Sequence, residues 1–188
     1  MFLPFFFSDE TLLCTLVRSS PLIGYKLLSS RATAGTAHFP LDSVSMKRCT
    51  HLVTINPFRR TVNLLRGLLS GVQIVSVDWL KNSAQQGLWL GELSYRPSGL
   101  PRSSRVRLLP NLFQKVGCIY VGHSSSPPRR DIIDLLTLGG ASTTNRKKVA
   151  NIVIGERIPE TICVKPTWVF DSIVRTRLLP LKPYQLRP

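Results

Sequence analysis

The hydrophobic positions in residues 61–80 predict a helix, a turn and a strand in close succession. Four leucines recur at the i, i+3 and i+4 spacing that places an apolar stripe on one helical face. They are Leu64, Leu65, Leu68 and Leu69. Gly71 then ends the helix, and the β-branched run over residues 72–77 is typical of a short buried strand. Trp79 follows as a large anchor in the next helix.

Two further strands and a helix are predicted before this unit. Residues 11–17 and 49–54 have the apolar, β-branched character of buried strands. Between them, Pro21 follows two serines, which is typical of a helix start, and we expect a helix over residues 21–30. Residues 31–48 are polar and irregular. Residues 1–10 form an N-terminal flank.

The same order of elements begins again after a basic linker. Residues 96–110 are rich in Pro, Gly, Ser and Arg, as linkers are. The elements predicted beyond it are a strand over 116–121, a loop over 122–128, a helix over 130–138 ended by Gly139-Gly140, strands over 149–154 and 161–164, and a helix over 166–173.

Trp79 and Trp168 take matching places in these two series, so the chain contains an internal repeat. Strands that alternate with helices in units this small imply a parallel sheet flanked by helices. The sequence therefore predicts an α/β fold with a first domain over residues 11–95, a linker over 96–110 and a second domain over 111–188.

The chain is strongly basic, with a formal net charge of +15. The charge is uneven, because residues 1–95 carry a net +4 and residues 96–188 a net +11. Such a balance favours an acidic partner such as nucleic acid, a phosphopeptide or an acidic tail. The basic clusters at residues 129–130 and 146–148 are most often solvated in proteins, and they can also contact DNA or an acidic histone surface. No aromatic residues interleave with them, which argues against specific single-strand binding.

No pattern of catalytic or metal-binding residues stands out. The four cysteines have no CxxC or Cys/His spacing, so we interpret them as reduced thiols. The three histidines have no nucleophile or carboxylate at a recognisable spacing. Gly139-Gly140 follows a helix and does not open one, which excludes a phosphate-cradling loop. We therefore expect a non-enzymatic protein without a cofactor, a small-molecule substrate or a membrane span.

Several motifs, taken in their order along the chain, resemble a tandem BRCT module. They are Thr50-His51-Leu52-Val53, Arg60-Thr61-Val62-Asn63, residues 74–80, Gly139-Gly140 and residues 168–172. The resemblance covers roughly residues 11–186. It implies two BRCT repeats, each a small parallel sheet flanked by helices, packed through a helical interface. It also implies a nuclear module that binds phosphoserine peptides.

The resemblance implies a phosphate site formed by Ser19, Ser20 and Asn63. Ser19 matches the phosphate-binding Ser or Thr that the family places after its first strand. Its hydroxyl and the Ser20 backbone N–H can both donate to a phosphate dianion. Asn63 stands where many relatives carry a lysine, and its amide donates hydrogen bonds without bringing a charge. The alternative for Ser19 is an ordinary helix N-cap.

The resemblance also implies a site for the third peptide residue after the phosphoserine. Arg60 matches the family arginine that contacts this residue, and a guanidinium suits a backbone carbonyl or a free C-terminal carboxylate. Leu65, Pro127 and Phe170 match positions that line the pocket for an aromatic side chain. The alternatives are a solvated arginine at a helix start and three ordinary core residues.

Some segments, among them residues 60–65 and 152–155, are closer to one member of the family. That likeness implies a particular ligand, the phosphorylated tail of the histone variant that marks damaged chromatin. The setting would be the DNA-damage response and chromosome condensation. Two alternatives stay open, namely a BRCT scaffold for phosphate-independent protein interactions and nonspecific nucleic-acid binding through the basic surface.

Overall fold

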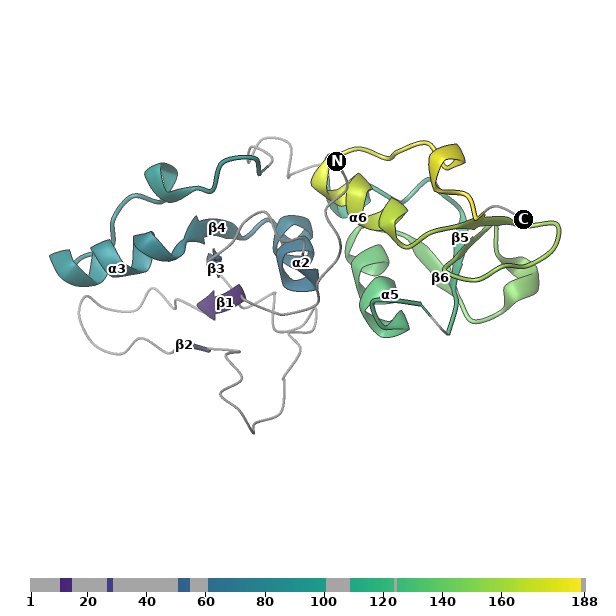
Figure 1. The fold of residues 1–188 in the computed structure, drawn as a ribbon, viewed down its shortest axis with the longest axis horizontal. Coiled ribbons are helices and arrows are strands. Elements are labelled where there is room, and N and C mark those ends of the chain that lie inside the picture. Colours follow the sequence, from purple (N-terminus) through teal and green to yellow (C-terminus); the bar gives the residue numbers. More distant parts are fainter. Residues whose placement is uncertain are drawn as a thin grey trace. The chain divides into compact units, whose positions relative to one another are not determined.

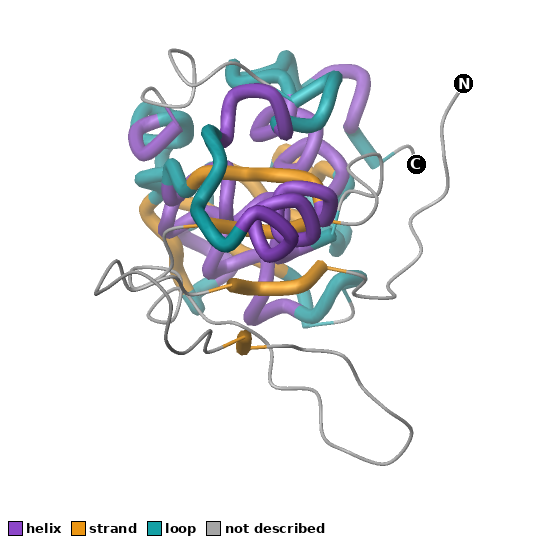
Figure 2. Tube along the Cα trace, turned by 90° about the vertical axis from the view of Figure 1, so that its left-hand side faces the viewer, coloured by secondary structure: helices purple, strands orange, loops and turns teal. Residues whose placement is uncertain are grey.

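The computed structural model describes residues 11–14, 27–28, 51–54, 61–100, 109–123 and 125–186. Two compact units follow one another along the chain, and the main segment of the second starts at Pro101. Each unit contains one four-stranded sheet with helices beside it (Figure 1). Figure 2 shows the strands in orange and the helices in purple. The residue boundaries of the two domains stay predictions.

The first unit contains a mixed sheet with the strand order β2-β1-β3-β4. The strands are β1 (Thr11–Cys14), β2 (Leu27–Leu28), β3 (His51–Thr54) and β4 (Gln73–Ser76). Strands β3 and β4 pair in parallel, with His51 opposite Gln73 and Thr54 opposite Ser76. This parallel pair is confirmed as predicted.

Strand β1 departs from the all-parallel expectation, because it pairs antiparallel with both β2 and β3. A parallel pair needs a crossover that carries the chain back along the sheet, usually through a helix. The helix predicted over residues 21–30 would have supplied one, but Leu27 and Leu28 form β2 instead. That prediction is wrong at these two residues. Gly24 weakens the helical preference of the segment, and the two leucines suit a strand equally well.

The helices of the first unit are α2 (Val62–Ser70) and α3 (Val77–Gln86), followed by a 3-10 turn over Glu92–Tyr95. The leucine stripe of α2 is buried as predicted, and Gly71 follows the helix with a φ of +68°. Helix α2 lies very close to β3 at Gly67. A Cβ atom there would be 2.7 Å from Leu52 Cδ2, so a larger residue would require the buried Leu52 side chain to shift.

The second unit contains the parallel sheet that the sequence predicts, in the order β6-β5-β7-β8. Its strands are β5 (Cys118–Val121), β6 (Ser142–Thr144), β7 (Ile152–Ile154) and β8 (Ile162–Val164). The helices are α5 (Arg129–Leu138) and α6 (Thr167–Val174), with 3-10 turns at Leu109–Asn111, Lys147–Val149 and Lys182–Tyr184. Strand β6 was not predicted, because this edge strand is polar and partly exposed.

Trp79 organises the C-terminal part of the first unit. Its ring is 1% exposed and packs with the core strands. The indole Nε1 donates to the carbonyl oxygen of Leu90 at 2.8 Å, and Ser83 Oγ accepts from the Leu90 N–H at 3.2 Å. Asn82 Nδ2 donates to the Tyr95 hydroxyl at 3.0 Å. Three side chains of α3 therefore hold the segment that follows it.

Helix α6 makes a corresponding set of hydrogen bonds in the second unit, with donor and acceptor exchanged in the third. Trp168 Nε1 donates to the carbonyl oxygen of Leu179 at 2.9 Å, and Ser172 Oγ accepts from the Leu179 N–H at 3.3 Å. The Tyr184 hydroxyl donates to Asp171 Oδ2 at 2.8 Å. The sequence separations of 11, 7 and 13 residues are the same as in the first unit. The predicted internal repeat is thus confirmed at the level of individual hydrogen bonds.

Candidate functional site

Helix α2 carries the candidate phosphate-binding side chain, Asn63, in its first turn. Thr61 caps the helix, since its Oγ1 accepts a hydrogen bond from the Leu64 N–H at 3.2 Å. Residues 63–69 are buried without exception, so the polar face of the helix is enclosed together with its leucines. Polar groups in such a place need hydrogen-bond partners.

Asn63 is 2% exposed, and its amide is held by the next turn of the helix. Arg66 Nη1 donates to Asn63 Oδ1 over 3.4 Å. Residues three apart share a helical face, which brings these two side chains together. The contact engages the oxygen of the Asn63 amide, Oδ1.

Arg66 is a neighbour of the candidate residue Asn63 that the sequence did not single out. It is only 4% exposed, although arginine keeps its charge at all physiological pH values and is rarely buried. The available signal was its position three residues after Asn63 on the same helix. The leucine stripe concealed it, because a charged residue between leucines is normally taken as solvent-facing.

The other predicted site residues fall into two groups. Leu65 on α2 and Phe170 on α6 are each 1% exposed, and Pro127, just before α5, is also buried. All three are apolar and enclosed, which suits both the core and the pocket interpretation. Ser19, Ser20 and Arg60 lie outside the described residues. The joint action of these residues on one peptide stays a prediction.

Other kinds of site find no support in the described part of the chain. There, His, Cys, Asp and Glu side chains nowhere gather in groups of three or more that could hold a metal ion. Cys118 and Cys163 are both free thiols. No described helix combines the length and apolar character that a membrane crossing needs.

Comparison with known proteins finds relatives along most of the chain, although no family model matches it. Mouse microcephalin is 27% identical over 151 residues, and human microcephalin is 29% identical. Both alignments cover 73% of this chain and 18% of the relative, so the chain spans less than a fifth of their length. Mouse BRCA1-associated RING domain protein 1 is 33% identical over 92 residues, or 46% of this chain.

Solved structures share the arrangement of elements. The complex of Rtt107p with a phosphorylated histone matches with a TM-score of 0.62 at 13% identity, and the match covers 79% of each chain. The BRCT5-BRCT6 domains of S. pombe Brc1 match with a TM-score of 0.53 at 16% identity, over 72% of this chain and 82% of that one. At such identities the likeness concerns the fold. The family member that several segments resemble is microcephalin, and this prediction is confirmed by the sequence match.

Proposed function

We propose that this chain, which is similar to microcephalin in sequence and to tandem BRCT structures in fold, is a tandem BRCT protein whose two units together bind a phosphoserine peptide. One observation carries the proposal. The fold matches, over 79% of the chain, that of a protein whose solved complex contains a phosphorylated histone. BRCT domains are typically protein-interaction modules, and we assign no catalytic activity to the chain.

We assign the phosphate to the first unit, with Ser19, Ser20 and Asn63 as donors. Phosphate oxygens only accept hydrogen bonds, so a useful partner must present N–H or O–H groups. The contact between Arg66 and Asn63 Oδ1 is compatible with this requirement, because it engages the acceptor end of the amide and not its donor end. Since Asn63 is 2% exposed, its amide has to become accessible when the peptide binds.

We assign the third residue after the phosphoserine to Arg60, Leu65, Pro127 and Phe170. The guanidinium would bind the peptide backbone or a free C-terminal carboxylate, while the three apolar side chains would surround an aromatic ring. Leu65 and Phe170 are each only 1% exposed, so such a pocket has to open when the peptide binds.

The proposed ligand is the phosphorylated C-terminal tail of the histone variant that marks damaged chromatin. The likeness to microcephalin supports this choice, and we assign the match to the C-terminal BRCT pair of that protein. The setting would be the nucleus, in the DNA-damage response and chromosome condensation. A scaffold that binds proteins without reading phosphate is the second candidate, and the lack of charge at Asn63 favours it.

A titration separates the two candidates. The 188-residue chain is titrated with a serine peptide that has an aromatic residue three positions later and a free C-terminus, in phosphorylated and unmodified forms. We expect the phosphorylated peptide to bind at least roughly tenfold more tightly than the unmodified one. The unmodified peptide lacks the phosphate and therefore the charge-assisted hydrogen bonds to it. Equal affinity for both forms at two salt concentrations would favour the scaffold.

A further inference from the structure

Two basic segments of the second unit, 16 residues apart in the sequence, lie side by side. Arg129, the first residue of α5, donates through Nη2 to Asn145 Oδ1 at 2.8 Å. Its Nε donates to the carbonyl oxygen of Val121 at 2.8 Å, at the end of β5. The start of α5 is therefore tied to the loop that precedes the basic 3-10 turn at Lys147–Val149.

A buried tyrosine ring holds cations from both segments. Arg129 Cζ lies 5.7 Å from the centroid of the Tyr120 ring, and Lys147 Nζ lies 5.5 Å from the same centroid. Cations at this distance from an aromatic ring are attracted by its π-electrons. Tyr120 itself is 1% exposed, so it serves as a fixed support for the two side chains. We call the group built on it the basic surface: Arg129, Arg130, Arg146, Lys147 and Lys148.

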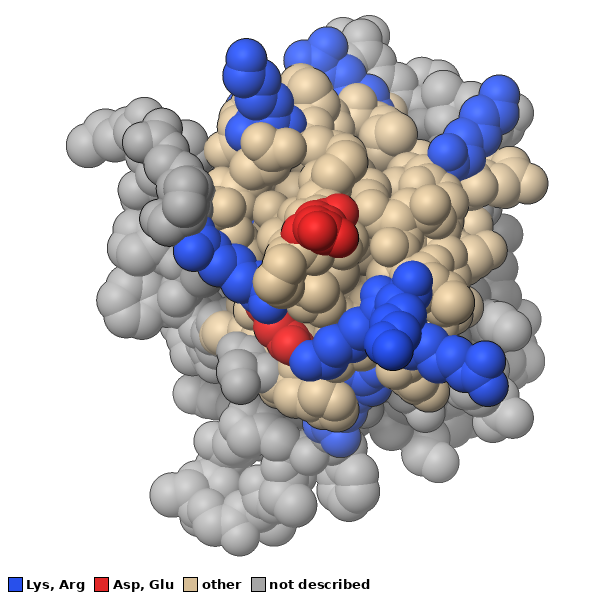
Figure 3. Space-filling model, turned by 90° about the vertical axis from the view of Figure 1, so that its right-hand side faces the viewer, with Lys and Arg blue, Asp and Glu red and all other residues tan. Residues whose placement is uncertain are grey.

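Nearby acids neutralise only part of this charge. Glu156 forms an ion pair with Lys147, and Asp131 Oδ1 lies 3.8 Å from Arg130 Nε. Arg146 and Lys148 are exposed, and within the described residues neither forms a salt bridge to an acid. Figure 3 shows blue Lys and Arg side chains in several groups around one face of the second unit, with red acidic side chains at its centre and beside the lower blue group.

The side chains around the basic surface point to a particular class of partner. The neighbouring edge strand β6 presents the hydroxyls of Ser142 and Thr143, which are both exposed residues. The only large apolar side chain of the adjoining turn that is exposed is Val149, at 54%. Protein partners are usually held by aromatic or aliphatic anchors, and single-stranded nucleic acid by stacking on exposed rings. The buried Tyr120 can do neither.

We propose that the basic surface of the second unit binds the phosphate backbone of duplex DNA, independently of the phosphopeptide site. Lys, Arg, Ser and Thr side chains are the usual ligands of backbone phosphates, and such contacts position a protein without reading sequence. The net charge of +11 over residues 96–188 strengthens the attraction at long range. On damaged chromatin, the surface would hold DNA while the peptide site holds a phosphorylated tail.

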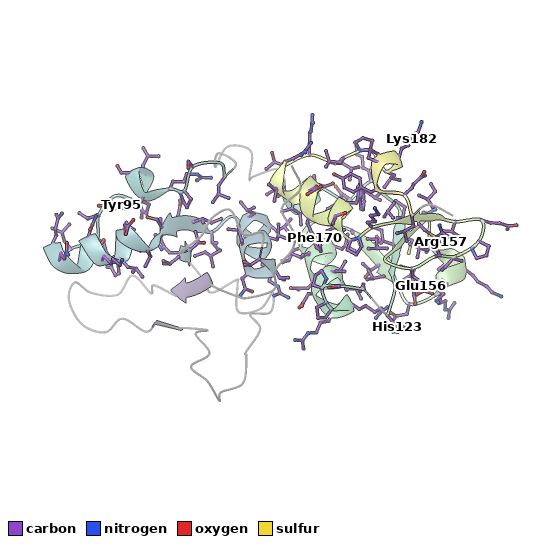
Figure 4. All side chains as sticks on the ribbon, in the orientation of Figure 1. Tyr95, His123, Glu156, Arg157, Phe170 and Lys182 are labelled. Carbon is purple, nitrogen blue, oxygen red and sulfur yellow. The ribbon has the colours of Figure 1, made fainter. Side chains whose placement is uncertain are left out.

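The test compares two double variants of equal charge change in the full chain. Arg146→Gln with Lys148→Gln removes two cations of the basic surface. Arg177→Gln with Lys182→Gln removes two exposed cations elsewhere in the same unit. Figure 4 shows Lys182 on the opposite side of this unit from Glu156, which pairs with the basic surface. Binding to a fluorescent duplex of about 20 base pairs is measured by anisotropy over a series of salt concentrations.

The first pair of substitutions should weaken binding roughly tenfold and lower the slope of log affinity against log salt by about 2, while the control pair has a much smaller effect. Glu156→Gln should strengthen binding, because it releases Lys147. The affinity for the phosphopeptide should be unchanged in all three variants. Equal losses of duplex affinity in both double variants would overturn the proposal. Tighter binding of poly-glutamate than of the duplex would also overturn it and would indicate an acidic protein as the partner.

Discussion

The indole nitrogen of Trp168 donates a hydrogen bond to the carbonyl oxygen of Leu179 over 2.9 Å. Trp79 and Leu90 form the same bond in the first unit. In each case a buried tryptophan both fills the core and fixes the backbone 11 residues later. A buried indole needs such a partner, so the bond and the packing depend on one another.

Trp168→Phe should destabilise the second unit by about 1–3 kcal/mol, because the ring keeps most of its packing while the Leu179 carbonyl loses its donor. Trp168→Ala should cost about 3–5 kcal/mol, since it also leaves a cavity. Urea unfolding of the two variants measures both values. Trp79→Phe is the matched control in the first unit. Equal costs for the Phe and Ala variants at Trp168 would contradict this division between hydrogen bond and packing.

Gly67→Ala should destabilise the protein even though alanine favours helices more than glycine does. The helical preference would stabilise α2 by about 1 kcal/mol. The new Cβ would lie 2.7 Å from Leu52 Cδ2, and relieving that overlap should cost about 1–3 kcal/mol, which equals or exceeds the gain from helical preference. Ser70→Ala at the exposed end of the same helix is the control and should be neutral or slightly stabilising. An increase in melting temperature for Gly67→Ala would show that β3 yields to α2.

Arg66→Leu should lower the affinity for the phosphorylated peptide and leave the affinity for the unmodified peptide unchanged. The substitution removes the hydrogen bond that Arg66 Nη1 donates to Asn63 Oδ1. One hydrogen bond of about 1 kcal/mol corresponds to roughly a fivefold loss of affinity. Calorimetric titration with both peptide forms measures it. Lys81→Leu, at an exposed position on α3 of the same unit, matches the charge change. An equal loss for the unmodified peptide would assign Arg66 a purely structural role.

Lys147 should lose its proton at higher pH than an ordinary lysine does. The hydrogen bond that it donates to Glu156 is the main cause, and it raises the pKa of Lys147 above its ordinary value of 10.5. Because folding raises this pKa, the pair of Lys147 and Glu156 stabilises the folded state in full below pH 10.5. This contribution is lost as the pH rises through the higher pKa that Lys147 has in the folded state. Glu156→Gln should move the pKa of Lys147 back, which NMR titration of its Cε resonance can follow. An unchanged value would show that Glu156 does not control it.

The sequence was most informative where burial and periodicity coincide. The sequence predicts the leucine stripe of α2, the strand β7 and the two tryptophan helices. Apolar residues at these spacings can be buried in few other structures. Residues 27–28 were predicted wrongly, since two leucines suit a helix and a strand equally well. Strand β6 was missed because its partly exposed Ser and Thr residues carry no apolar alternation.

The candidate site was only partly predictable. Asn63 came from the family resemblance, but the burial of Arg66 beside it depends on the packing around α2, which a sequence pattern does not reveal. The basic surface shows the same limitation. The sequence shows residues 129–130 and 146–148 as two separate charge clusters. Only the structure shows that Tyr120 and Asn145 bring these clusters together.

A crystal structure of the whole chain with the phosphoserine peptide tests the central claim most directly. The account predicts that a phosphate oxygen lies within about 3.2 Å of Asn63 Nδ2, with further hydrogen bonds from the Ser19 hydroxyl and the Ser20 N–H. A phosphate seated instead against Arg146 and Lys148, with Asn63 unchanged, would contradict it.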